Sequence, residues 1–101
     1  MKKSTLEIEL NTIEETVVQA IESDLRAVNP KRCKETRDLM TVLTVVSTVA
    51  TLIETLLEIR EKLTKQRTAP EITMRNANRD ELRLREASEE QIRAFVTEAE
   101  D

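Results

Sequence analysis

The chain has 101 residues, of which 39% are hydrophobic and 36% are charged, with a formal net charge of −4. It contains no Gly, His, Trp or Tyr, and its one aromatic side chain is Phe95. The absent Gly excludes a glycine-rich phosphate loop, and the absent His removes the commonest general base and metal ligand near neutral pH. One aromatic residue cannot form a stacking platform for single-stranded nucleic acid. We therefore expect a single domain over residues 1–101 that is not an enzyme, holds no cofactor or metal, and binds no nucleic acid.

The N-terminal third predicts a strand followed by a helix. Apolar and acidic residues alternate over residues 5–10, the pattern of a half-buried strand. A helix beginning at Ser4 is the alternative, because Glu and Leu are good helix formers. Apolar residues then recur every three to four positions over residues 12–28, which predicts an amphipathic helix. Pro30 and the restriction that it places on Asn29 should end that helix.

Cys33 follows this helix and is the single cysteine, so the chain forms no internal disulfide. A nucleophilic cysteine normally needs a base partner such as His, so we interpret Cys33 as an inert residue between two elements. Near the N-terminus, Glu7 and Glu9 interrupt any apolar run of a secretory signal. Both observations predict a cytoplasmic location.

The central segment over residues 38–66 predicts one long apolar helix. Its apolar residues repeat at alternating spacings of three and four. The β-branched run Thr-Val-Leu-Thr-Val-Val would favour a strand in isolation, but the length of the repeat favours a helix. The apolar seam comprises Leu39, Val42, Val46, Val49, Ile53 and Leu56, and a threonine stripe comprises Thr44, Thr48 and Thr51.

This helix would be longer than the domain that carries it. A helix over 38–66 would span about 43 Å, whereas a compact domain of this size has a diameter of roughly 34 Å. The seam and the stripe are therefore the candidate interaction residues, covered by a second copy or by another protein, and we expect a homo-oligomer. Fifteen residues between Asp38 and Glu54 are too few to span a membrane, but they allow membrane contact within an oligomer.

The C-terminal third predicts a β-hairpin and a short helix. Apolar and polar residues alternate on both sides of an Asn-rich turn at 77–79, which predicts a hairpin over residues 71–86. Ser88 and Gln91 have the spacing of a capping box, which predicts a helix over residues 89–100. The fold expected from these patterns is α+β with the order β-α-α-β-β-α.

The succession of elements resembles a known family. The apolar segment, the run Ile-Arg-Glu-Lys-Leu at 59–63, the hairpin, and the helix that begins Ala-Ser-Glu-Glu-Gln-Ile resemble the effector-associated constant component family of bacterial conflict systems. The resemblance implies an adaptor role and implies no particular site residues.

From these patterns we expect an adaptor that couples or regulates an effector through its central helix. Two alternatives stay open: a membrane-associating or pore-type oligomeric subunit, and a small inhibitor or antitoxin-like regulator.

Overall fold

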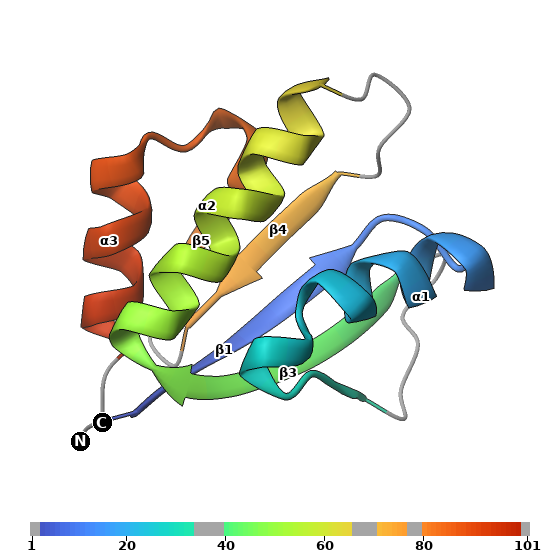
Figure 1. Cartoon of the computed structure of the whole chain (residues 1–101), viewed down its shortest axis with the longest axis horizontal. Coiled ribbons are helices and arrows are strands. Elements are labelled where there is room, and N and C mark those ends of the chain that lie inside the picture. Colours follow the sequence, from blue (N-terminus) through green and yellow to red (C-terminus); the bar gives the residue numbers. More distant parts are fainter. Residues whose placement is uncertain (1–2, 34–39, 66–70, 77–79, 100–101) are drawn as a thin grey trace.

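The computed structural model describes residues 3–33, 40–65, 71–76 and 80–99. Within these residues, five strands form one antiparallel sheet that packs against three helices (Figure 1). The strands are β1 (Lys3–Leu10), β2 (Lys31–Arg32), β3 (Thr41–Thr48), β4 (Ile72–Arg75) and β5 (Glu81–Arg83). The helices are α1 (Glu15–Asp24), α2 (Val49–Lys65) and α3 (Glu89–Glu98), and the 3-10 turns are η1 (Arg26–Val28) and η2 (Leu84–Glu86).

Strand β1 is the centre of the sheet, whose order is β2-β3-β1-β4-β5. It pairs along its whole length with β3, and over Glu7–Leu10 with β4. Every second residue of β1, from Ser4 through Leu6 and Ile8 to Leu10, is buried. The apolar residues of the alternation that predicted a strand over 5–10 are therefore the ones on the face of β1 that packs against the helices.

The central segment does not form the predicted helix over 38–66. Residues Thr41–Thr48 form strand β3, and the chain passes directly into α2 at Val49. Leu43 and Val45 are fully buried whereas Val46 is exposed, which is the alternation of a strand with one buried face. The β-branched residues that lower helix propensity decided the conformation, because pairing with β1 gives them a pleated surface on which to pack.

The predicted order β-α-α-β-β-α is wrong for the same reason. The described elements follow β-α-β-β-α-β-β-α, since β2 and β3 stand before α2. Strand β2 has only two residues and lies in the basic run after Pro30, where no apolar alternation marks it. The two strands of the predicted hairpin are β4 and β5, which pair antiparallel, and the predicted turn at 77–79 lies outside the described residues.

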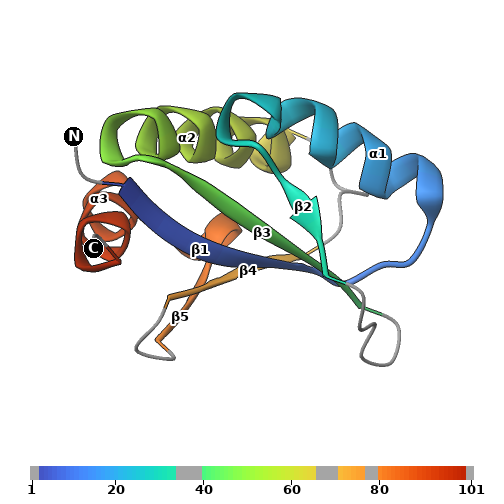
Figure 2. The same cartoon turned by 90° about the horizontal axis from the view of Figure 1, so that it is seen from below.

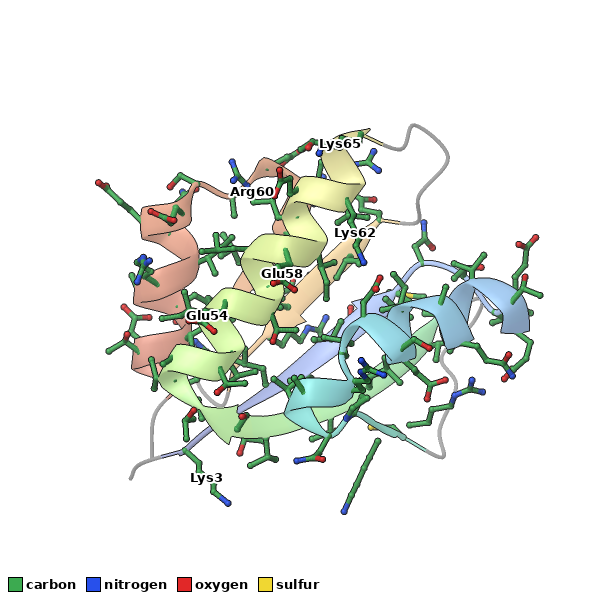
Figure 3. The ribbon with its side chains drawn as sticks, viewed as in Figure 1. Lys3, Glu54, Glu58, Arg60, Lys62 and Lys65 are labelled. Atoms are coloured by element: carbon green, nitrogen blue, oxygen red, sulfur yellow. The ribbon has the colours of Figure 1, made fainter. Side chains whose placement is uncertain are left out.

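Helix α2 is not an exposed apolar helix. Its 17 residues span about 26 Å, which is less than the longest extent of the molecule, 34 Å. Its apolar side is buried against the sheet and α3, whereas Glu54, Glu58 and Lys62 lie on its outer side (Figure 3). We predicted an oligomer because the expected helix had more apolar surface than one domain could cover. Helix α2 has no such uncovered apolar side. Among the described residues, no helix is both long enough and apolar enough to cross a membrane.

The helices gather on one side of the sheet. Helices α1 and α2 lie over the same face, and α3 packs beside α2 (Figures 1 and 2). Ser4 of β1 donates a buried hydrogen bond of 2.9 Å to the Val96 carbonyl, which fixes α3 against the central strand. The capping box predicted at Ser88 and Gln91 is present, with both of its hydrogen bonds formed.

Substitutions in β3 should distinguish the observed strand from the helix that the sequence pattern predicted for the same residues. Leu43→Ala should lower the free energy of unfolding by about 2–4 kcal/mol, because it removes buried methyl groups and leaves a cavity. Val46→Ala should lower it by less than about 1 kcal/mol, since that side chain lies on the opposite, exposed face. Chemical denaturation followed by circular dichroism measures both. Equal losses would contradict the strand, because residues three apart share one face of a helix.

Candidate interaction surface

The side of the sheet opposite the helices carries a run of uncharged side chains along β3. Val42, Thr44, Val46 and Thr48 are two residues apart, so they share this face of the strand. All four are at least partly exposed, and Val46 has 39% of its surface accessible. Val49 and Thr51 at the start of α2 are partly exposed as well, although Val49 also packs against the hydrophobic core, and we call these six residues the β3 surface.

The β3 surface contains six of the nine residues predicted from the sequence to make an interface. The six come from both the apolar seam and the threonine stripe, which a helix would have placed on different sides. Ile53 and Leu56 belong instead to the hydrophobic core, with 6% and 0% exposure. Leu39 lies outside the described residues.

The threonines at the corner between β3 and α2 hold the start of the helix. The Thr51 N–H donates to Thr48 Oγ1 at 3.4 Å, and the Thr48 hydroxyl donates to Thr51 Oγ1 at 2.9 Å. Thr48 thus occupies the N-cap position of α2 and satisfies a backbone donor of its first turn. Residues 46–51 are all at least partly exposed and all uncharged, so the corner extends the β3 surface onto the helix.

The charged side chains of this face lie across the other strands. Arg75 of β4 forms ion pairs with Glu9 of β1 at 3.2 Å and with Glu81 of β5 at 2.7 Å. Residues 40–53, by contrast, carry no charge. The face therefore has a charged half, in which Arg75 pairs with Glu9 and Glu81, and an uncharged half formed by β3, whose Thr44 lies opposite the exposed Glu7 of β1.

Two lysines border the uncharged half. Lys3 of β1 is opposite Thr48, and Lys31 of β2 is opposite Thr44, so both project on the open side of the sheet. Both are exposed, and Lys3 extends away from the body of the molecule (Figure 3). Cys33 follows β2, with its Sγ 3.4 Å from the Thr44 hydroxyl. The β3 surface is thus a strip of methyl and hydroxyl groups bordered by the positive charges of Lys3 and Lys31 and, beside Thr44, by the carboxylate of Glu7.

Arg32 fixes strand β2 to helix α1 on the other side of the sheet. Its Nη2 atom lies 2.6 Å from Glu15 Oε1 and 2.6 Å from Glu22 Oε1. The hydrogen bonds from Arg32 lower the pKa of Glu15, and those to Glu15 and Glu22 raise the pKa of Arg32. A second ion pair, Lys62 to Asp24 at 2.7 Å, joins α2 to α1, and its hydrogen bond raises the pKa of Lys62.

The sequence patterns did not indicate the ion pairs of Arg32 with Glu15 and Glu22, which we call the Arg32 clamp. Glu15 is 17 positions from Arg32, and only the return of the chain along the edge of the sheet brings them together. The signal available was a basic residue in a run without apolar periodicity, which does not specify a partner.

The described side chains do not form the clusters that metal sites need. Nowhere in residues 3–33, 40–65, 71–76 and 80–99 do three His, Cys, Asp or Glu side chains lie close enough to share an ion. What the arrangement can do chemically is bury its uncharged strip against another surface.

Comparison of the chain with protein-family models, with curated proteins and with solved structures finds no match in any of the three. The resemblance to the effector-associated constant component family stays a prediction.

The Arg32 clamp predicts an acid-sensitive contact between β2 and α1. Because the folded-state pKa of Glu15 is depressed, the clamp stabilises the fold above the unfolded-state pKa, and this contribution is lost as the pH falls through the folded-state pKa. Carboxyl carbon NMR should show Glu15 titrating below the ordinary range of glutamate, and Arg32→Gln should return it to that range. Arg26→Gln is the matched control and should leave the titration of Glu15 unchanged. An identical Glu15 titration in the wild type and in Arg32→Gln would contradict the clamp.

Proposed function

We propose that the protein is a non-enzymatic adaptor that binds another protein through the β3 surface. The observation that carries this proposal is the uncharged strip on β3, which exposes Val46 while charged side chains of β1 and β2 border it. Interfaces concentrate their binding energy in uncharged centres that are surrounded by polar groups. The strip and its charged border have that arrangement.

The surroundings of the strip favour a partner of defined chemistry. Threonine side chains offer both a methyl group and a hydroxyl, so a partner can pack against them and form hydrogen bonds at little cost in rotamer entropy. Lys3 and Lys31 border the strip, which favours carboxylates on the partner's surface near them, whereas Glu7 opposite Thr44 favours a cationic group on the β1 side. Arg75 already forms ion pairs with Glu9 and Glu81, so we do not expect it to attract a negatively charged group of the partner.

The observed fold favours one of the three functions expected from the sequence, which is protein binding. A membrane-associating subunit and a helix-wrapping inhibitor both relied on a long exposed apolar helix. In the structure, Leu52 and Leu56 of α2 are fully buried, and the outer side of that helix is charged. The exposed uncharged surface lies on a strand instead, which supports protein binding. The resemblance to an effector-associated family supports the same class of function.

Co-expression with the products of neighbouring genes tests the adaptor. The wild-type chain should retain one of these proteins at a fixed stoichiometry through affinity purification and gel filtration. Thr44→Lys and Val46→Lys should weaken that complex at least about tenfold in Kd, roughly 1.4 kcal/mol, because each places a long charged side chain in the uncharged centre of the interface. Isothermal titration calorimetry measures the loss.

The matched control is Ala94→Lys, which adds the same charge to an exposed position on α3. This variant should bind like the wild type, and circular dichroism should show all three variants folded. The proposal fails if no neighbouring gene product is retained, or if the two β3 variants bind as tightly as Ala94→Lys.

A further inference from the structure

Half of the outer edge of β3 has no neighbouring strand among the residues that the structure describes. Strand β2 pairs with β3 only at Leu43 and Thr44, whereas β3 continues to Thr48. In Figure 2, β2 lies beside one half of β3 and the other half runs on toward α2. Among the described residues, no other strand lies on that side of β3. Within the described part of the chain, the edge from Val45 to Thr48 has no paired strand, although η1 also contacts β3, and we call this stretch the open edge.

The geometry of the ladder identifies the backbone groups on this edge. The Cys33 N–H donates to the Val42 carbonyl at 2.9 Å, and in an antiparallel ladder every second residue faces the same neighbour. Val46 thus directs both its N–H and its C=O group toward the open side, and Thr48 directs its N–H there, whereas the Thr48 carbonyl also accepts the first hydrogen bond of α2. Continued pairing of β2 would bring Asn29 opposite Val46, but Asn29 has a left-handed backbone with a φ of 51°, which turns the chain away.

The open edge also lacks the protection found on the rest of the sheet's outer strands. Strand β2 consists of Lys31 and Arg32, and strand β5 carries Glu81 and Arg83. Charged residues on edge strands normally prevent pairing with another chain. The segment Val45–Thr48 has no charge and no proline, and three of its four residues are β-branched. The composition of this segment favours pairing with another strand, and β2 does not pair with it.

We infer that the open edge of β3 pairs antiparallel with the same edge of a second copy of this chain, with Val46 opposite Thr48 of the second copy. This register is self-complementary, because it sets the outward N–H and C=O groups of Val46 against those of Thr48 on both sides of the twofold axis. The Thr48 carbonyl has a second lone pair available beside the one that α2 uses. No charged residue meets its like across the axis, and the two five-stranded sheets become continuous.

This inference rests on the proposed function, since it gives the adaptor two copies of the β3 surface on one continuous sheet. The side chains of Val42 and Thr44 remain on the open face, because edge pairing uses main-chain groups. A dimer of this kind would hold two partner proteins side by side.

Sedimentation velocity over a concentration series into the high micromolar range tests the pairing. The wild type should shift from monomer to dimer as its concentration rises. Val46→Pro should stay monomeric with an unchanged circular dichroism spectrum, because proline is tolerated on an edge strand where the N–H faces outward. Val46→Thr keeps the N–H and the β-branch and should dimerise like the wild type. A monomeric wild type, or a dimer that survives Val46→Pro, would overturn the inference.

A charge exchange tests the register. Val46→Lys alone and Thr48→Asp alone should each weaken the dimer at least tenfold, because like charges gather near the twofold axis. Mixed together they should form a heterodimer, since the introduced ammonium lies opposite the introduced carboxylate. Aspartate is also a good N-cap, so the start of α2 is preserved. A mixture that stays monomeric would overturn the register.

The same variants separate this inference from the proposed function. Thr44→Lys alters the open face and should lose the partner protein while it keeps the dimer. Val46→Pro should lose the dimer. A monomeric wild type that still binds its partner would reject self-pairing and leave the adaptor, whereas a dimer that binds no partner would reject the adaptor alone.

Discussion

The fold depends on the pairing of β1 with both of its neighbours. β1 lies between β3 and β4, which the chain connects only through α2, and each pairing leaves the same set of side chains on the helix side. Leu6, Ile8 and Leu10 meet the core there with 1% exposure or less. Since a shift of one residue would turn this whole set toward solvent, the apolar alternation of β1 fixes the register of the sheet. The position of every surface side chain on β3 follows from that register.

The separation of charged and uncharged residues has a similar origin. Pairing in register brings Arg75 between the acidic side chains of β1 and β5, and their mutual ion pairs occupy one half of the open face. Strand β3 lies on the other side of β1 and contributes no charge. An exposed ion pair is worth little for stability, about 0–1 kcal/mol. The ion pairs matter more for the surface, because they confine charged side chains to one half of the face and leave the β3 half uncharged.

The sequence predicted most accurately those elements whose pattern fits only one period. The capping box at Ser88 has a single simple interpretation, and the alternation over 5–10 favoured a strand over a helix beginning at Ser4; the strand and the capping box both occur in the structure. The segment from Val42 to Val49 was ambiguous, because positions 42, 46 and 49 fit a helical repeat while 42, 44, 46 and 48 fit a strand. No Gly or Pro marks the change at Thr48, so local patterns could not divide the segment. The ion pairs of Arg32 depend on tertiary proximity, which no local spacing encodes.

The direct passage from β3 into α2 has a mechanical consequence. No linker residue separates Thr48 from Val49, and the Thr48 hydroxyl ties the last strand residue to the first turn of the helix. A flexible hinge would let the strand tilt while the helix stayed still. Here a rotation of the peptide plane at Thr48 must tilt the axis of α2 as well, so the strand and the helix behave as a single bent lever. Such a tilt would disturb the packing of the buried α2 side chains Leu52 and Leu56, so the core beneath the helix also holds the end of β3 in place.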